Sequence, residues 1–231
     1  MLPIIYAVFS ALMVLILILA YRKVLLDSAI PARERSKKFR LALGFVVGWL
    51  IYLFLISMTG ILKDLSMPPK FPLLVFLPLV IGFIIFYKRT ARSRVLKAVP
   101  RSWPIYFQSF RVVVEVLLLM TFYSGIIPQS ATFEGLNFDI VMGISALFVA
   151  YFLVKGNKHR RLLYVWNFLG MIMVLFVAYI IASSMYFPGV WGASTPLVDL
   201  AFIEMPFLLL AGFLAPLAIF MHVVSLAQLR E

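Results

Sequence analysis

The positive charges of this chain fall in alternate gaps between seven long apolar stretches. Of the 21 Lys and Arg residues, seven lie at about 22–40, six at about 88–101, four at about 155–161 and one in the C-terminal tail. The intervening gaps hold only Lys63 and Lys70. Because cytoplasmic loops of membrane proteins are enriched in Lys and Arg, the pattern predicts seven bilayer crossings, with the N-terminus outside and the C-terminus in the cytoplasm.

The apolar content of the chain supports a membrane location. Hydrophobic residues make up 64% of the 231 residues, and the mean hydropathy is +1.07. A spanning helix needs about 20 residues, most of them apolar. The expected spans lie at about 3–21, 41–62, 71–87, 102–127, 138–154, 162–187 and 197–221. We therefore expect an all-α, polytopic membrane helical bundle that forms one domain over residues 1–231, with short loops and no soluble domain.

Composition also excludes several functions. The chain has no cysteine, which rules out disulfides, thiolate catalysis and Cys-ligated metal centres. Its two histidines, His159 and His222, do not predict a histidine-rich metal site. A net charge of +12 suggests nucleic acid in a soluble protein, but here short loops hold the charge and topology explains it. We expect no cofactor, no metal and no nucleic acid, and anionic lipids as partners of the cytoplasmic loops.

Three charged residues lie inside the expected spans. A charge at the bilayer centre costs about 2.5–3.5 kcal/mol on insertion scales, so such residues usually face a bundle interior. Arg111 and Glu115 are four residues apart and share a helical face with Gln108, so we expect an Arg111–Glu115 pair. Glu204 is expected in the outer third of the last span. This polar face predicts a site inside the bundle, a water-filled cavity or a contact with another subunit.

The expected fourth loop adds further polar residues at the outer mouth. Glu134, Asn137 and Asp139 lie there, and Asn137 fits the N-cap of the fifth span. His222 is expected near the cytoplasmic headgroups. The sequence predicts no catalytic residue and no metal ligand. The candidate ligand-binding residues are Arg111, Glu115, Glu204, Asp139, Glu134, Asn137 and Gln108.

Small residues and prolines predict how the spans pack. Stripes of small residues at helical spacing favour close helix contacts and are expected to face inward. These stripes are Gly44 and Gly48, then Gly143, Ala146 and Ala150, and finally Ala211, Ala215 and Ala218. Pro78, Pro206 and Pro216 lie within apolar stretches, where each removes a backbone donor and frees a carbonyl.

Two segments resemble a recurring signature of small bacterial inner-membrane proteins that has no assigned function. They are residues 106–111 (YFQSFR) with Glu115, and residues 132–139 (TFEGLNFD). The resemblance is strongest over the C-terminal part of the chain. It implies a seven-helix protein of the bacterial inner membrane and carries no residue roles.

Three functions remain open from the sequence. The first is a bundle that binds or transports a small molecule or ion at a polar site open toward the outer face. The second is an intramembrane enzyme that uses Glu115, Glu204 and Asp139 as acid–base groups or metal ligands. The third is a receptor or accessory subunit whose charged face docks on partner helices or on a second copy. A cavity that connects Glu115 and Glu204 to the outside would favour the first.

Overall fold

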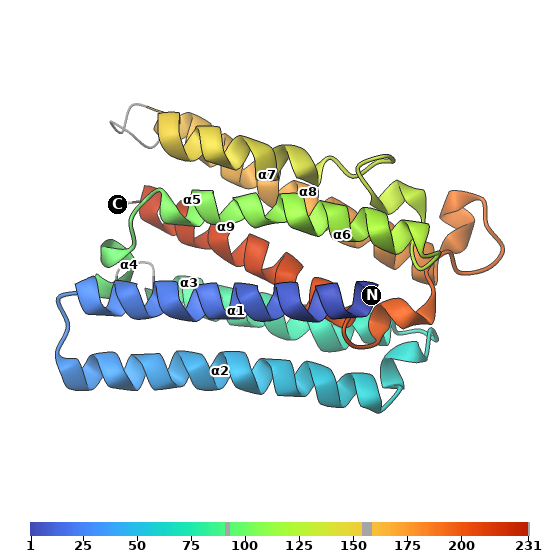
Figure 1. Ribbon diagram of the computed structural model, residues 1–231, viewed down its shortest axis with the longest axis horizontal. Helices are drawn as coiled ribbons and strands as arrows, with labels where there is room; N and C mark the ends of the chain where they lie inside the picture. The colour runs from blue at the N-terminus through green and yellow to red at the C-terminus, as the bar shows by residue number, and fades with distance from the viewer. Residues whose placement is uncertain (91–92, 154–158, 231) are drawn as a thin grey trace.

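The structure is a computed structural model that describes residues 1–90, 93–153 and 159–230, and these residues form an all-α bundle without strands. The long helices run side by side along one axis (Figure 1). The helical elements are α1 (Leu2–Asp27), α2 (Ala32–Met58), η1 (Ile61–Lys63), η2 (Pro72–Phe76), α3 (Leu77–Thr90), α4 (Arg94–Ala98), α5 (Trp103–Phe107), η3 (Gln108–Phe110), α6 (Arg111–Tyr123), η4 (Gln129–Ala131), α7 (Asp139–Phe148), η5 (Val149–Leu153), α8 (Arg160–Tyr186), η6 (Pro188–Trp191), η7 (Leu200–Ile203), η8 (Leu210–Leu214) and α9 (Ala215–Leu229).

Within the residues that the structure describes, five helical stretches are long and apolar enough to cross a membrane. They are Leu2–Asp27, Ala32–Met58, Trp103–Tyr123, Arg160–Tyr186 and Leu210–Leu229. Two further apolar helical stretches are shorter, Pro72–Lys88 and Asp139–Phe152. The prediction of an all-α bundle with apolar helices of membrane-spanning length is therefore confirmed, and the number of crossings stays a prediction.

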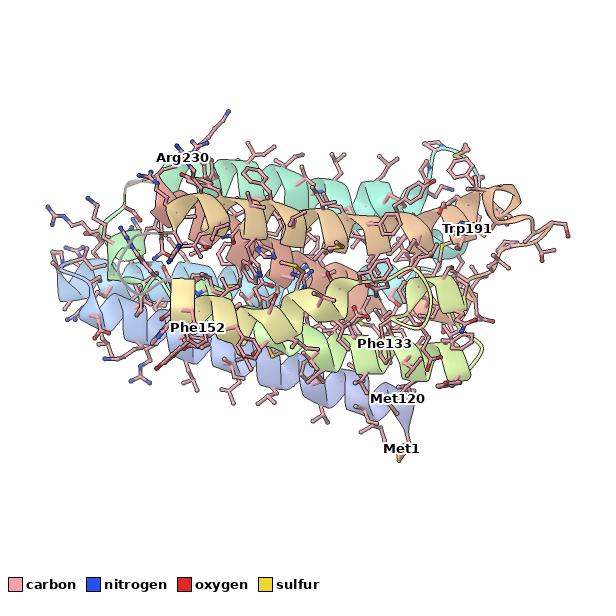
Figure 2. All side chains as sticks on the ribbon, turned by 90° about the horizontal axis from the view of Figure 1, so that it is seen from above. Met1, Met120, Phe133, Phe152, Trp191 and Arg230 are labelled. Carbon is pink, nitrogen blue, oxygen red and sulfur yellow. The ribbon has the colours of Figure 1, made fainter. Side chains whose placement is uncertain are left out.

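The two ends of the bundle differ in charge. The α1–α2 connection, α4 and the C-terminus lie at one end, and the N-terminus lies at the other (Figure 1). Figure 2 shows nitrogen-tipped side chains gathered around the end that holds Arg230. Three cations of the basic gaps, Arg92, Lys155 and Lys158, lie outside the described residues. The alternation of charge along the sequence thus becomes a difference between the two ends of one bundle.

Two lysines at the opposite end, Lys63 and Lys70, are each paired with an acid. Lys63 forms an ion pair with Glu204, and Lys70 forms one with Asp64. The hydrogen bond from Lys70 holds the pKa of the Asp64 carboxyl below its usual range. This end therefore offers less uncompensated positive charge than the basic end.

Two of the three prolines leave a backbone carbonyl without its helical hydrogen bond. Side chains of α2 donate hydrogen bonds to these carbonyls. Pro78 and Pro216 each follow a wider π-helical turn, η2 and η8 respectively. Neither proline can donate to the carbonyl four residues before it. Tyr52 Oη donates to the Leu74 carbonyl at 2.9 Å, and Trp49 Nε1 donates to the Gly212 carbonyl at 2.8 Å. The carbonyls left free by Pro78 and Pro216 thus accept the hydrogen bonds that hold α2 against the bundle.

Trp49→Phe should therefore destabilise the bundle even though an aromatic ring is kept. The Gly212 carbonyl is left without its donor, which costs about 1–3 kcal/mol for a buried acceptor. Unfolding in detergent, followed by circular dichroism, measures the change. The cost should fall in a Pro216→Ala background, because the restored backbone N–H offers a replacement donor. An equal cost in both backgrounds would argue against this origin.

Small residues pack closely in α7, as predicted, but not in α2. A Cβ on Gly143 would lie 2.9 Å from the backbone nitrogen of Val112, so α7 packs closely on α6 there. Around Gly44 and Gly48 nothing lies within 4 Å of such a Cβ. The prediction that these two glycines face inward is wrong. Helix α2 lies at the edge of the bundle and contacts it through Trp49 and Tyr52 instead.

The last long apolar helix begins and ends later in the chain than the predicted last span. The prediction was 197–221, whereas the long apolar helix is Leu210–Leu229. Asp199 caps the short turn η7 by accepting from the Ala201 backbone N–H at 2.7 Å. Pro206 follows soon after, and because it lacks an N–H it removes a hydrogen bond that a helix through this segment would need. The preceding segment is therefore a folded connection, and the helix runs eight residues further than its predicted end.

Candidate functional site

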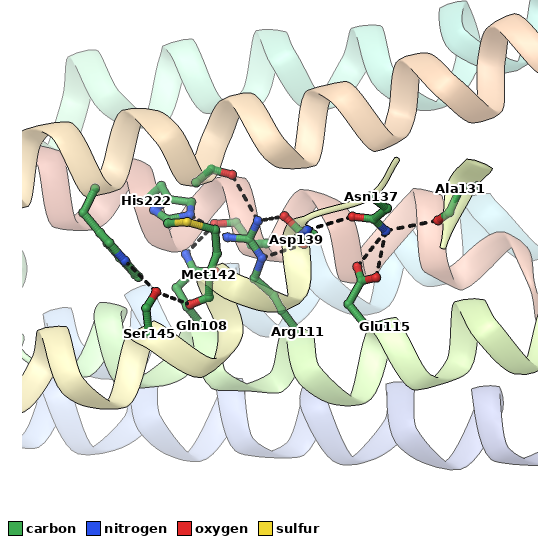
Figure 3. Close-up of polar contacts among 12 residues, drawn as sticks. Gln108, Arg111, Glu115, Ala131, Asn137, Asp139, Met142, Ser145 and His222 are labelled. Atoms are coloured by element: carbon green, nitrogen blue, oxygen red, sulfur yellow. Dashed lines mark hydrogen bonds and ion pairs between the residues drawn. The ribbon is translucent and has the colours of Figure 1, made fainter. Parts of the chain in front are cut away.

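Arg111 is the centre of a buried polar cluster. It begins α6, and its side chain is 1% exposed. The guanidinium forms a two-point ion pair with Asp139 on α7, with Nε to Oδ2 at 2.7 Å and Nη2 to Oδ1 as the second contact. Nη2 also donates to the Gly170 carbonyl on α8 at 3.1 Å, and Nη1 meets His222 Nε2 on α9 at 2.9 Å (Figure 3). One arginine thus links three other helices.

Asp139 reaches Arg111 because the connection before α7 enters the bundle. Arg111 lies eight residues after Trp103, the first residue of α5, which is about 12 Å along a helix. Asp139 is the first residue of α7, so α7 begins at that depth. Ala131, Thr132 and Asn137 in the preceding connection are buried. Asn137 and Asp139 therefore lie deep in the bundle, and their predicted place at the outer mouth is wrong.

Asn137 organises this buried connection. The N-cap position of α7 is Phe138, so the prediction of Asn137 as the N-cap is wrong by one residue. The Asn137 side-chain oxygen still accepts from the Asp139 backbone N–H at 2.8 Å, which satisfies a donor at the start of α7. Its amide nitrogen contacts both carboxyl oxygens of Glu115, at 3.0 Å and 2.8 Å, and the Ala131 carbonyl at 3.1 Å. Irregular backbone at membrane depth is tolerated where protein covers it and satisfies its polar groups.

Glu115 is not the hydrogen-bonding partner of Arg111. All three guanidinium nitrogens are engaged by Asp139, Gly170 and His222, and none of these bonds goes to Glu115. The predicted Arg111–Glu115 pair is therefore wrong. A carboxylate brought by another helix gives a two-point geometry that a neighbour four residues along the same helix does not. Glu115 is 1% exposed and its hydrogen bonds come from an uncharged amide.

His222 extends the cluster toward the basic end of the bundle. Arginine only donates, so Nε2 of His222 must accept from Arg111 and the ring proton must lie on Nδ1. Nδ1 then donates to Asn167 Oδ1 at 2.9 Å. Asn167 in turn donates to the Leu163 carbonyl at 2.8 Å and to Ser225 Oγ at 3.0 Å. The pattern assigns a neutral His222 in one tautomer.

The sequence reasoning missed the role of His222 and of Asn167. His222 is fully buried, so its predicted place near the headgroups is wrong. The reason is that α9 continues to Leu229 and carries His222 well inside the bundle. A signal was present, since Asn167, His222 and Ser225 are isolated polar residues in otherwise apolar helices. Such residues in membrane spans usually have a polar partner on another helix.

Gly170 allows the His222 ring to approach α8. A Cβ at this position would lie 2.3 Å from both Cε1 and Nε2 of His222. The missing side chain also leaves the Gly170 carbonyl accessible to Arg111. The absence of a side chain at Gly170 thus lets both His222 and Arg111 pack against α8.

Gln108 shares the buried face of Arg111 and Glu115, as predicted. Its amide nitrogen donates to the Ala218 carbonyl at 2.9 Å. Its side-chain oxygen is buried and has no hydrogen-bond partner in the described structure. All three polar residues of this face lie inside the bundle.

A small cavity borders the cluster. Its volume is about 40 Å³, and the charged residues on its wall are Arg111, Glu115 and Asp139. The rest of the lining is apolar: Phe71, Phe76, Phe110, Val114, Leu118, Val174, Val177, Ala178, Ile181, Phe202, Leu210, Ala211, Leu214, Ala215 and Ala218. One water molecule needs about 10–15 Å³ of such space and a cavity of about 150 Å³ binds benzene, so this cavity has room for water or a small ion.

Two predicted site residues lie away from this cluster. Glu204 is in the turn before the last helix, where its side chain is 45% exposed and pairs with Lys63. Glu134 is exposed and accepts a long hydrogen bond from Tyr123 Oη at 3.3 Å. The cavity reaches Glu115 but not Glu204. Within residues 1–90, 93–153 and 159–230, no three His, Cys, Asp or Glu side chains are grouped so that they could hold a metal ion.

These features define a class of protein, an all-α bundle of membrane-length apolar helices around a buried charged network. The chain belongs to the uncharacterised family described as "Domain of unknown function (DUF8737)", whose model matches residues 68–230. The match contains every residue of the Arg111 cluster, whereas α1 and α2 precede it. No curated protein and no solved structure matches the chain.

Proposed function

We propose that this chain is a single-domain, seven-span protein of the bacterial inner membrane, with its N-terminus outside. The charge difference between the two ends supports this orientation. The short stretch Asp139–Phe152 completes a crossing together with the buried connection that precedes it. Labelling of single cysteines at Lys37 and Lys70 with a membrane-impermeant maleimide checks the orientation, since the chain has no cysteine of its own.

We further propose that the bundle binds or transports a small ion at Glu115. The observation that carries this proposal is a buried carboxyl that faces a cavity and whose hydrogen bonds, within the described part of the chain, come from Asn137 alone. The charges of Arg111 and Asp139 compensate each other. An ionised Glu115 would leave one negative charge in a low-dielectric interior, which is costly unless a cation or proton joins it.

The lining of the cavity supports access from the N-terminal end of the bundle, because it extends to connections at that end. Besides the charged residues, its lining includes Phe71, before η2, and Phe202, in η7. Both come from connections at the end opposite Arg230 (Figure 1). In the proposed orientation this is the outer face.

Glu115→Gln tests this function in proteoliposomes. The wild-type protein should carry a flux of protons, sodium or potassium above that of protein-free liposomes, measured with ion-sensitive dyes under an imposed potential. The flux through the variant should be at least tenfold lower, because the glutamine amide has no negative charge to balance a cation or proton. Glu134→Gln, which changes an exposed carboxyl, is the matched control. Equal flux in wild-type and Glu115→Gln liposomes would contradict the proposal, and loss of folded protein in Glu115→Gln alone would point to a structural role.

The basic end supports a second contact, with anionic lipids. Lys37 and Arg40 on α2 are exposed near this end. In the proposed orientation they meet the cytoplasmic leaflet, where each cation near the surface contributes about 1 kcal/mol of attraction. The Arg111 cluster, by contrast, is paired within the chain and presents no charged face to a partner helix.

A further inference from the structure

We infer that the ion held at Glu115 is a proton, carried on the Glu115 carboxyl itself. This inference rests on the ion-binding function proposed above and names the ion. Hard cations such as calcium and magnesium need about six oxygen ligands, and potassium sites replace the hydration shell with several carbonyls. The question is therefore how many free oxygens the cavity offers.

The cavity wall offers few oxygens for a metal ion. No lining side chain carries a hydroxyl or an amide, and the lining carboxyls are Glu115 and Asp139. Both oxygens of Asp139 are taken by Arg111. A bare metal ion would therefore meet mainly the two oxygens of Glu115.

Three backbone carbonyls around the cluster already accept a hydrogen bond each. The Gly170 carbonyl accepts from Arg111, the Ala131 carbonyl from Asn137, and the Gly212 carbonyl from Trp49. A proton needs no such shell, because it requires one carboxyl oxygen and a neighbouring acceptor such as water. A cavity of about 40 Å³ has room for that water.

The titratable groups around Glu115 are otherwise balanced. Arg111 on α6 and Asp139 on α7 compensate each other, and His222 on α9 is neutral because its Nε2 accepts from Arg111. Tyr6 on α1 donates to Thr121 Oγ1 at 2.7 Å, since the Thr121 hydroxyl donates to the Leu117 carbonyl. Helix α8 presents the Gly170 carbonyl to the cluster. Glu115 is thus the group whose charge a proton would balance.

The transfer step is simple. Hydronium in the cavity gives up one O–H bond, a carboxylate oxygen of Glu115 forms a new one, and a water molecule remains. The second carboxyl oxygen still accepts from the Asn137 amide. The new hydroxyl points to the cavity water, so both forms of the carboxyl keep a partner.

Infrared difference spectroscopy of the full chain in lipid tests this inference. On acidification, a C=O band of a protonated, non-aqueous carboxyl should appear in the wild type and in Glu134→Gln, and should be absent in Glu115→Gln. Replacing sodium and potassium in the buffer by choline should leave the band unchanged. Persistence of the band in Glu115→Gln, or its suppression by sodium or potassium, would overturn the inference.

A second variant keeps the test decisive if Glu115→Gln does not fold. Asn137→Ser retains Glu115 but removes the amide donor that favours its ionised form. The band should then appear at a higher pH than in the wild type, and an unchanged midpoint would count against the inference.

Titration of Glu115 without flux of any ion would retain this inference and overturn transport. If the wild type carries a sodium or potassium flux that Glu115→Gln loses, and no carboxyl band titrates, transport is retained and this inference is overturned.

Discussion

Replacing Arg111 with leucine should lower the free energy of unfolding by about 3–5 kcal/mol, the range measured when one partner of a buried ion pair is removed. The substitution leaves the Asp139 carboxylate buried without its two-point partner. It also removes the donors to the Gly170 carbonyl and to His222 Nε2. Chemical unfolding of purified protein in detergent, followed by circular dichroism, measures the loss.

A double variant that replaces both Arg111 and Asp139 distinguishes the loss of their ion pair from a general packing defect. Arg111→Leu combined with Asp139→Leu removes both charges, so its cost should be smaller than that of Arg111→Leu alone. Glu134→Gln, at an exposed position, should change stability little. A double variant that loses as much as the two single variants added together would contradict the assigned pair.

Gly170→Ala should cost about 1–3 kcal/mol, which is typical of adding one methyl group to a packed interior. The new Cβ would lie 2.3 Å from two atoms of the His222 ring, whose nitrogens are held by Arg111 and Asn167. The ring must therefore move and its hydrogen bonds must weaken. Unfolding measurements give the cost, and nitrogen chemical shifts of His222 report whether the tautomer persists.

Gly48→Ala is the control for Gly170→Ala. It places the same methyl group within a helix, at a position with nothing within 4 Å of the new Cβ. Its stability should be unchanged or slightly raised, because alanine favours helix more than glycine does. Equal losses in the two variants would show that the close His222 contact is not the cause.

The buried face of α6 could be predicted from the sequence, but its pairing could not. Gln108, Arg111 and Glu115 were correctly placed together inside the bundle, because helical spacing and the cost of charge in lipid are properties of one segment. The partner of Arg111 comes from α7, and which helix brings an acid to it depends on tertiary packing. The same holds for His222, whose place was misjudged along with the end of α9.

The irregular connections were hardest to predict. Hydropathy places the segment with Glu204 in a span, since Phe202, Leu208 and their neighbours are apolar. The chain instead folds this segment as an irregular connection whose apolar side chains, Phe202 and Leu208 among them, are buried, while Glu204 stays partly exposed and pairs with Lys63. The connection with Asn137 shows the opposite case, because a polar sequence enters the bundle when its donors and acceptors find partners there.

The sequence by itself determined the all-α membrane-type bundle and the separation of charge between its ends. Both follow from local terms, namely the transfer of apolar segments out of water and the distribution of Lys and Arg between them. Only the tertiary structure decided that Arg111 pairs with Asp139, that His222 joins them, and that Glu115 faces a cavity with Asn137 as its hydrogen-bond donor. These contacts join residues far apart in the chain, so they depend on the depth at which each helix begins and on glycines that let helices approach. That depth is set by packing and hydrogen-bond satisfaction over the whole bundle, and no single segment encodes it.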